Sequence, residues 1–329
     1  MMNKKMKKIG ILTSGGDAPG MNAAIRAVVR ACNYYNTECV GIYRGYQGLI
    51  EGDFIPLGPR NVSNIINRGG TILKSARSKE FMTKEGRAKA YENIKKAEID
   101  GLILIGGDGT FTGGMIFNEE YKFPCIGIPG TIDNDIFGTN YTIGYDTALN
   151  TVVEAIDKIR DTASSHNRLF FVEVMGRDAG FIALNAGVGA GAEEILIPEE
   201  DMGLDRLLES LKRTKRSGKS SSIVVIAEGD KIGKNVSELA NYVEENLKQY
   251  EVRVSVLGHM QRGGSPSCFD RVLASRLGVK AVELLLDGQS NLMVGLINNK
   301  VETTELENAV KGHHEINKEL VRVSDMMSI

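Results

Sequence analysis

Two carboxylates stand one residue apart directly after a short apolar run in IGIPGTIDND, residues 126–135. Asp133 and Asp135 follow a proline and a glycine, which are residues that end strands and start turns. Such a pair of acids can form a turn, bind a metal ion or move a proton. Along an extended strand both side chains would point to the same face, whereas a turn after Gly130 would separate them.

Two further glycine-rich stretches follow apolar runs, TSGGDAPGMN at 13–22 and IGGDGTFTGG at 105–114. Glycines at a strand end let the backbone approach a phosphate closely, and a following helix supplies N–H groups and a positive dipole end. One such stretch is as often a tight turn, but three in one chain favour phosphate binding. Asp108 within GGDGT is a hard carboxylate that suits Mg²⁺, and Thr110 offers a hydroxyl to a phosphate oxygen.

Four arginines stand at the ends of apolar runs, at positions 168, 177, 253 and 262. A single arginine is more often a solvated surface side chain. Its planar guanidinium nevertheless suits phosphate, because it donates two hydrogen bonds at once. Anion sites, a candidate magnesium ligand and paired acids together indicate phosphoryl transfer, in which positioning and charge stabilisation carry most of the catalysis.

Short apolar runs alternate with helical spacing along the chain. The runs predict strands at 8–15, 39–43, 100–107, 125–130, 168–176, 221–229 and 252–258, and the spacing predicts helices at 21–35, 85–98, 145–163, 203–216 and 236–248. Uninterrupted apolar strands separated by helices indicate parallel sheets covered on both faces. The predicted fold class is α/β, with two sheets, and ligands of such sheets bind where strands end and helices begin.

Length and composition are those of a globular protein with two domains, since 329 residues are long for one core. Lys plus Arg total 40 against 42 Asp plus Glu, a net charge of -2 that argues against nucleic-acid or acidic-membrane partners. The four cysteines lack C-x-x-C and zinc spacings and are typical of reduced thiols. No segment has the length of a signal peptide's apolar core or a membrane span. We therefore expect a cytoplasmic protein.

Five motifs, in this order and spacing, resemble bacterial ATP-dependent 6-phosphofructokinases over essentially the whole chain: GGDAPGMNAAIR, GGDGTF, PGTIDNDI, VEVMGRDAG and LGHMQRGGSP. The GGDG motif alone is weak evidence for this family, because NAD kinases and lipid kinases also carry it. PGTIDND together with GHMQRGG is highly specific for the family. The resemblance implies transfer of the γ-phosphoryl group of ATP to the 1-hydroxyl of fructose 6-phosphate. It also implies two Rossmann-like three-layer α/β/α domains with mainly parallel sheets and the active site in the cleft between them.

The resemblance implies that both domains are discontinuous. The ATP-binding domain would comprise 1–143 plus 256–306, and the fructose 6-phosphate-binding domain 144–255 plus 307–329. The run at 252–258 agrees with this arrangement, because a glycine-rich segment follows it, as glycine-rich segments follow the strands predicted in the N-terminal part of the chain.

Site residues are carried over from the family motif by motif. The residues implied to bind ATP are Gly16, Arg77, Ser78, Gly107, Asp108, Gly109 and Thr110, with Asp108 on Mg²⁺. Those implied to bind fructose 6-phosphate are Thr131, Ile132, Asp133, Met175, Gly176, Arg177, Glu228, His259, Met260, Gln261 and Arg262, joined by Arg168 and Arg253 from a neighbouring subunit of a homotetramer.

Asp133 is implied as the base for the sugar hydroxyl, with Thr131 beside it, and Arg177 and Arg77 would complement the moving negative charge. Asp135 has several open roles. It can raise the pKa of Asp133 through like-charge proximity, or it can orient Mg²⁺ or water.

The phosphoryl donor follows from two glycines. Pyrophosphate-using relatives resemble GGDD and PKTIDND, whose side chains fill the space of the ATP α-phosphate. Gly109 and Gly130 have no side chain here, so the resemblance implies ATP as the donor.

A second site is implied between subunits, where ADP or phosphoenolpyruvate regulates many family members. The matching residues are Arg26, Arg30, Arg60, Arg160, Glu193 and Lys219. Pro59 stands where the family usually has arginine and Asn64 where several relatives have aspartate, so the effector, its strength and its sign stay open. The basic run around Lys219 can equally be a solvated helix end.

Three other functions fit the sequence less well. Another GGDG enzyme such as an NAD kinase would leave PGTIDND and GHMQRGG unexplained. A non-catalytic nucleotide-sensing relative would be favoured by loss of Asp108 or Asp133, and both are present. A dehydrogenase is disfavoured because the chain lacks the G-x-G-x-x-G fingerprint at its strand ends.

Overall fold

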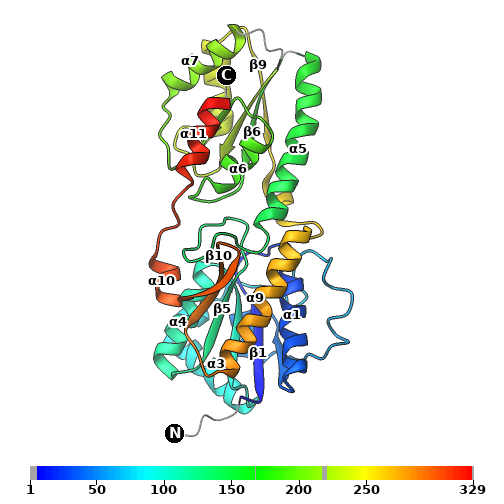
Figure 1. The fold of residues 1–329 in the computed structure, drawn as a ribbon. Helices are drawn as coiled ribbons and strands as arrows, with labels where there is room; N and C mark the ends of the chain where they lie inside the picture. Colours follow the sequence, from blue (N-terminus) through cyan, green and yellow to red (C-terminus); the bar gives the residue numbers. More distant parts are fainter. Residues whose placement is uncertain (1–5, 167, 217–220, 328–329) are drawn as a thin grey trace. The chain divides into compact units, whose positions relative to one another are not determined.

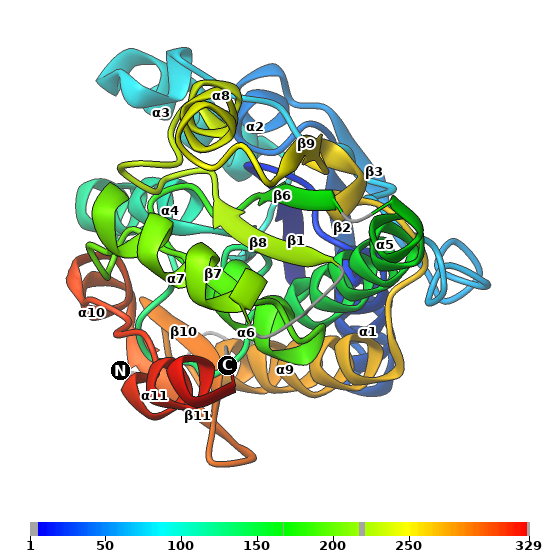
Figure 2. The same ribbon diagram turned by 90° about the horizontal axis from the view of Figure 1, so that it is seen from above.

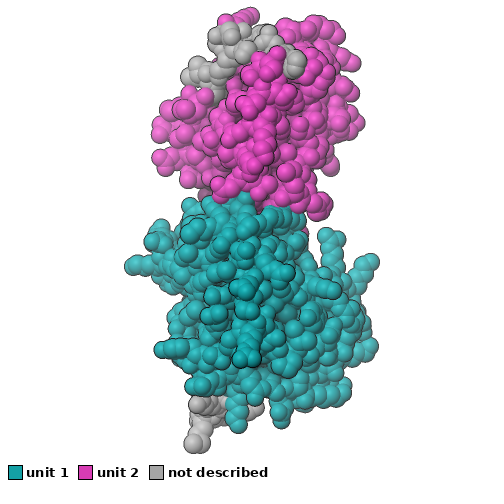
Figure 3. All heavy atoms as spheres, turned by 90° about the vertical axis from the view of Figure 1, so that its right-hand side faces the viewer, with its two compact units in different colours: residues 1–131, 136–147, 262–314 teal, residues 132–135, 148–261, 315–329 magenta. Residues whose placement is uncertain are grey.

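The computed structural model describes residues 6–166, 168–216 and 221–327. The chain forms two compact units, which Figure 3 colours separately. Unit 1 comprises Met1–Thr131, Ile136–Thr147 and Arg262–His314, and unit 2 comprises Ile132–Asp135, Ala148–Gln261 and Glu315–Ile329. The domain boundaries that we expected after residues 143, 255 and 306 stay a prediction.

Unit 1 is built on a seven-stranded sheet with the order β11-β10-β5-β4-β1-β2-β3. The strands are β1 (Lys8–Thr13), β2 (Glu38–Ile42), β3 (Phe54–Pro56), β4 (Gly101–Gly106), β5 (Cys125–Pro129), β10 (Leu292–Ile297) and β11 (Lys300–Glu305). β3 and β11 run antiparallel to their neighbours, and the five inner strands are parallel. Every residue of β4 and β5 is buried, which explains their uninterrupted apolar sequences.

Helices cover both faces of this sheet. They are α1 (Met21–Tyr34), α2 (Tyr46–Glu51), α3 (Lys84–Lys96), α4 (Asp108–Tyr121), α9 (Cys268–Leu286) and α10 (Leu306–Lys311), with the short 3-10 helix η1 (Glu80–Met82). Figures 1 and 2 show α1 and α9 packed side by side. Leu49, Ile94 and Phe117 bring α2, α3 and α4 into one core with β1, β2 and β4.

Unit 2 is built on a four-stranded parallel sheet with the order β7-β8-β6-β9 (Figure 2). Its strands are β6 (Arg168–Val174), β7 (Glu194–Leu196), β8 (Ser222–Ala227) and β9 (Glu251–Val256), and its helices α6 (Phe181–Gly189), α7 (Leu204–Arg216), α8 (Val236–Asn246) and α11 (Lys318–Met327). Leu207 and Leu211 of α7 and Leu239 of α8 pack on β6 and β8. Two elements run from one unit into the other along the chain, α5 (Tyr145–His166) and the 3-10 helix η2 (Gly258–Arg262).

The predicted α/β class and all seven predicted strands and five predicted helices are confirmed. The hairpin of β10 and β11 was not predicted. Its two-residue turn is Asn298-Asn299, whose φ angles of 49° and 61° are the left-handed pair that a type I′ turn needs. The Asn-Asn pair directly after the apolar run of β10 was the signal that sequence reasoning passed over. None of the helices within the described ranges is both long and apolar enough to cross a membrane.

Candidate active site

Three glycine-rich segments meet at one edge of the unit 1 sheet. They follow β1, β4 and β5, which are adjacent and parallel, so their carboxyl ends lie on the same side. Two backbone hydrogen bonds tie the segments together, from Ser14 N to Ile105 O at 3.0 Å and from Gly130 N to Gly106 O at 2.9 Å. The structure therefore brings the predicted phosphate-binding segments together.

The N-terminus of α4 lies within this edge. Gly107 caps the helix and Asp108 is its first residue, so the first-turn N–H groups and the positive dipole end stand beside a half-buried carboxylate. A Cβ added to Gly109 would meet nothing within 4 Å, so the space above this turn is open. Thr110 is buried, and its Oγ1 lies 2.3 Å from the position of a Cβ added to Gly106. This end of α4 suits an anion.

Gly130 is explained by packing. A Cβ at this position would lie 2.9 Å from Cγ2 of Ile105 and 3.3 Å from Cε of Met21, both in the core. In this chain the packing of Ile105 and Met21 therefore favours glycine at position 130, and the glycine does not by itself indicate open space for a ligand. The inference that space left by a missing side chain allows ATP as the donor therefore depends on Gly109 alone.

Arg262 packs against the first glycine-rich segment. A Cβ added to Gly16 would lie only 2.5 Å from Nη1 of Arg262, and the same nitrogen donates to Asp17 O at 3.4 Å. Arg77 is exposed, in a stretch without regular structure. Ser78 accepts from Phe81 N at 3.2 Å and donates to Gln47 Oε1 at 2.7 Å, so its hydroxyl holds the start of η1.

A second group of predicted residues meets within unit 2. Nε of Arg177 lies 3.6 Å from Oδ2 of Asp133. The Asp133 side chain is 2% exposed and that of Arg177 is 58% exposed, so a buried acid faces a cation with access to solvent. A buried carboxylate next to a cation can serve as a general base. The guanidinium can donate hydrogen bonds to a phosphoryl group.

The loop that carries Arg177 is held in an unusual backbone conformation. Gly176 has φ of 145° and Arg177 has φ of 53°, a left-handed value that non-glycine residues adopt rarely. Oε1 of Glu228 accepts hydrogen bonds from Arg177 N at 2.8 Å and Gly176 N at 3.3 Å. Oε1 of Gln261 accepts from Met175 N at 3.2 Å. Glu228 and Gln261, predicted as substrate contacts, thus also fix this loop.

The remaining residues that were predicted to contact the sugar differ in their burial and in their partners. Arg168 Nη2 lies 3.1 Å from Oε1 of Glu251, which also pairs with Arg253, and the hydrogen bond from Arg168 lowers the pKa of this glutamate. His259 and Met260 are exposed on η2. Ile132 is fully buried, so its side chain belongs to the core.

The predicted effector residues fall into two groups within one chain. Arg26 and Arg30 lie on α1 in unit 1, where burial and then the charge of Arg30 lower the pKa of Arg26. Arg160 and Glu193 lie in unit 2 with Nη1 and Oε1 3.8 Å apart, and Arg160 also donates to two carbonyls at 2.7 Å. Arg60 is exposed after β3, and Lys219 lies outside the described residues.

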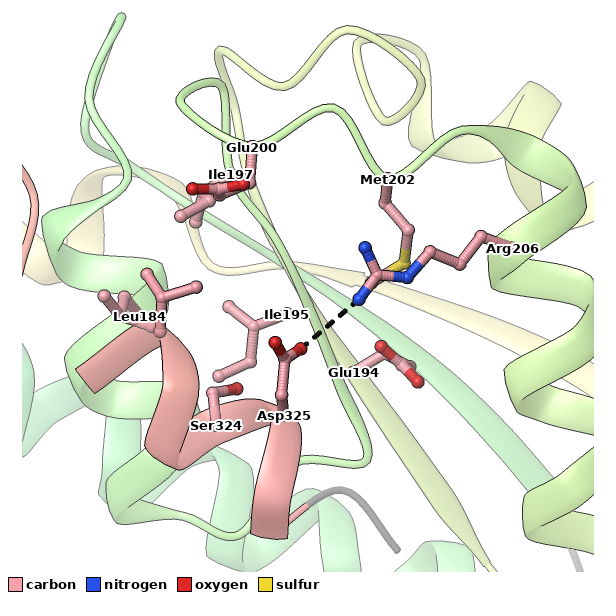
Figure 4. A pocket seen from close by; sticks show the side chains of 10 residues that line it. Leu184, Glu194, Ile195, Ile197, Glu200, Met202, Arg206, Ser324 and Asp325 are labelled. Carbon is pink, nitrogen blue, oxygen red and sulfur yellow. Dashed lines mark hydrogen bonds and ion pairs between the residues drawn. The ribbon is translucent and has the colours of Figure 1, made fainter. Parts of the chain in front are cut away.

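A cavity of about 50 Å³ opens elsewhere in unit 2 (Figure 4). It lies between α6, β7, α7 and α11, and an ion pair from Arg206 to Asp325 at 3.5 Å borders it. Glu194 is 7% exposed on its wall, and Ser210 Oγ donates to its carboxylate. None of the described residues that line the cavity was predicted as a site residue.

Glu194→Gln is expected to raise the thermal unfolding midpoint at neutral pH. Burial raises the pKa of Glu194, so the folded chain holds this proton more tightly than the unfolded chain. Stability from this group is therefore lost as the pH rises through the raised pKa, and glutamine removes that loss. The gain should vanish below the ordinary pKa of glutamate, and Glu209→Gln on the exposed side of α7 should show none. A lower midpoint for Glu194→Gln at neutral pH would contradict this expectation.

Several known proteins are similar to this chain in sequence over nearly its whole length. A protein-family model described as phosphofructokinase matches residues 8–285. The ATP-dependent 6-phosphofructokinase 1 of Thermus thermophilus is 57% identical over 324 residues, which cover 98% of this chain and 100% of its own. The ATP-dependent 6-phosphofructokinase of Bacillus subtilis is 54% identical over 324 residues, with 98% and 100% covered.

Solved structures show the same fold. The phosphofructokinase of Saccharomyces cerevisiae is 35% identical with a TM-score of 0.87, and the match covers 98% of this chain and 47% of that chain. This chain thus spans about half the length of the yeast protein. The Pichia pastoris phosphofructokinase in the T-state is 36% identical with a TM-score of 0.88, and the match covers 98% of this chain and 36% of that chain.

Proposed function

This chain belongs to the phosphofructokinase family, and on that premise we propose that it transfers the γ-phosphoryl group of ATP to the 1-hydroxyl of fructose 6-phosphate. The products are fructose 1,6-bisphosphate and ADP. The observation that carries the proposal is the buried carboxylate of Asp133 with the Arg177 guanidinium 3.6 Å away. Asp133 lies four residues after β5 in sequence. β5 pairs with β4, which in turn pairs with β1, and both β4 and β1 end in phosphate-type glycine segments. A base, a cation and an anion site are the parts that phosphoryl transfer needs.

In the proposed mechanism Asp133 accepts the proton of the 1-hydroxyl as the bond to phosphorus forms. Arg177 complements the negative charge of the phosphoryl group, and its position is supported by the two N–H bonds to Glu228. The transition state of phosphoryl transfer is loose, so positioning of these groups contributes more than the strength of the base.

Asp108 is the proposed ligand of Mg²⁺. Among the described residues, no three His, Cys, Asp or Glu side chains gather as a metal site. Proteins usually hold magnesium through one or two carboxylates and the phosphates of the substrate. A half-buried carboxylate at the N-terminus of α4 supplies one such ligand. The ion would neutralise charge on the triphosphate.

Asp108→Asn is expected to lower kcat about 100-fold and to raise the Mg²⁺ concentration that gives half-maximal rate. The amide keeps the shape of the side chain but removes its charge. The KM for fructose 6-phosphate should change little. The measurement is a magnesium titration of initial rates at saturating ATP and sugar phosphate. Asp53→Asn, which removes a carboxylate from a surface ion pair with Arg44, is the control and should leave the titration unchanged. An unaltered titration for Asp108→Asn would remove this aspartate from the metal site.

The proposal includes assembly and regulation. We propose a cytoplasmic homotetramer in which Arg168 and Arg253 reach the sugar phosphate of a neighbouring subunit. The exposure of Arg253 on β9, an edge of the described sheet, supports this. ADP or phosphoenolpyruvate would bind at the arginine groups of α1 and α5, with the sign of their effect left to experiment.

A coupled assay of fructose 6-phosphate phosphorylation tests the function. It is run with ATP and with pyrophosphate, and with and without ADP and phosphoenolpyruvate. We expect ADP release that depends on fructose 6-phosphate, with negligible turnover of pyrophosphate. Turnover of pyrophosphate equal to that of ATP would contradict the assignment of ATP as the donor. ATP turnover that does not depend on fructose 6-phosphate would contradict the assignment of the acceptor.

A further inference from the structure

Two helix N-termini cap each other in unit 1. Ser267 is the N-cap of α9, and its hydroxyl also donates to Asp146 in the first turn of α5. In the opposite direction Asp270, in the first turn of α9, accepts from the start of α5. Its Oδ1 accepts from Gly144 N at 2.9 Å, and its Oδ2 accepts from Thr147 N at 2.8 Å and from the Thr147 hydroxyl. Each helix thus supplies acceptors for the other.

Asp270 is fully buried, which is unusual for an aspartate. Burial raises its pKa to about 6, although the hydrogen bonds from Thr147 and Gly144 act to lower it. A buried carboxylate costs free energy, and three donors with two helix dipoles offset that cost. An asparagine cannot accept all three bonds, because half of its amide is a donor.

The segment that Asp270 holds has little room to shift. Gly144 has φ of 103°, and a Cβ there would lie 2.7 Å from Cβ of Ala18. A Cβ at Gly20 would lie 2.6 Å from Cγ2 of Ile143. The first glycine-rich segment and Asp270 therefore both pack against residues 143–147.

The same segment restrains the predicted catalytic loop. Ile143 N donates to Pro129 O at 2.9 Å, and Ile143 bridges Gly130. The hydroxyl of Thr142 donates to Thr131 O at 2.6 Å. A chain of contacts thus leads from Asp270 through residues 142–147 to Thr131, two residues before Asp133.

We propose that Asp270 is a positioning residue for phosphoryl transfer, which holds Thr131 and the start of the loop to Asp133 in the reactive arrangement. It acts through Gly144, Thr147 and Thr142. The proposal rests on the proposed function, because the loop it serves is the one assigned to the acceptor sugar.

The test compares Asp270→Asn, Asp270→Ala and Thr142→Val with the wild-type full-length chain. Small misplacements of reacting groups cost rate steeply, so we expect kcat to fall about 10-fold in Asp270→Asn and about 100-fold in Asp270→Ala. Thr142→Val keeps the shape but removes the hydroxyl, and it should also lower kcat about 10-fold. Rates are expressed per folded site, counted by ATP binding, and the KM for ATP should stay near wild type.

Glu120→Gln is the matched control for lost stability. It weakens a bidentate ion pair in unit 1, where Glu120 accepts from Arg87 Nε and Nη2 at 2.7 Å each. This variant should unfold at a lower temperature and keep its kcat. An independent readout is hydrogen exchange, which should speed up at residues 142–147 in Asp270→Asn and stay unchanged there in Glu120→Gln.

The outcomes distinguish a failure of the role assigned to Asp270 from a failure of the proposed function. If the Asp270 variants do not fold, Thr142→Val decides the matter alone. Wild-type kcat per folded site in Thr142→Val and in every folded Asp270 variant would overturn the inference and leave the proposed function standing. An equal loss of kcat in Glu120→Gln would also overturn it. A wild-type chain without ADP release in response to fructose 6-phosphate would overturn the proposed function itself.

Discussion

Asp133→Asn is expected to lower kcat about 1000-fold, because general base catalysis contributes between about 100-fold and 10,000-fold. The amide has the shape of the carboxylate and cannot accept the proton of the sugar hydroxyl. The KM for fructose 6-phosphate should change little, since the acid acts mainly in the transition state. Folding should tolerate the change, because the cation 3.6 Å away on Arg177 is 58% exposed and stays solvated. Initial rates over a range of sugar phosphate concentrations measure both constants.

Asp135→Asn is the matched control for this variant. Asp135 is half-buried, whereas Asp133 is 2% exposed and faces Arg177. We expect Asp135→Asn to keep far more activity than Asp133→Asn. A fall of less than about tenfold in Asp133→Asn would end the assignment of this acid as the base. A larger fall in Asp135→Asn than in Asp133→Asn would transfer the role to the second acid.

Gly109→Asp is expected to lower kcat/KM for ATP about 100-fold or more, since an added carboxylate would repel the triphosphate at short range. A Cβ at this position meets nothing within 4 Å, so the new side chain would occupy the open space above the N-terminus of α4. The charge would also lie near Asp108, the proposed magnesium ligand. The KM for fructose 6-phosphate should stay near wild type. Initial rates at varied ATP concentration provide the measurement.

Gly109→Ala separates charge from backbone effects. It adds the same Cβ without a carboxylate, and the open space around it predicts nearly unchanged folding and only a small loss of kcat/KM for ATP. Equal losses in the alanine and aspartate variants would mean that backbone freedom, not the space and charge of a side chain, matters here. An aspartate variant with wild-type ATP kinetics would place the triphosphate away from this turn.

The chemistry and the main strands could be predicted because they depend on neighbours in sequence. β4 and β5 are short apolar runs in which every residue is buried, and both end in glycine-rich turns. Binary pattern and turn residues therefore located the segments around Asp108 and Asp133. The hairpin at β10 and β11 was open to the same reasoning through Asn298-Asn299, but its exposed outer strand lacks an apolar run.

The supports of the site were decided by tertiary structure. Asp270 binds Thr147 across 123 positions of sequence, and Glu228 binds Arg177 across 51. The Ser-x-x-Asp spacing of Ser267 and Asp270 is typical of a helix start, although we did not use it to predict a helix, and nothing in it indicates that the acid caps a second helix.

Gly130 shows the same limit at a single residue. In the sequence it is a turn glycine in a motif, and in the structure Ile105 and Met21 leave no room for a Cβ. Local patterns record which face of an element is apolar and where it ends. By itself, then, the sequence determined the α/β class, the order of the main elements and the family, and it supplied the site residues that stay a prediction. The hydrogen bonds that hold Thr131 and Arg177 in place were decided by packing between distant segments, because each requires a partner that no local pattern specifies.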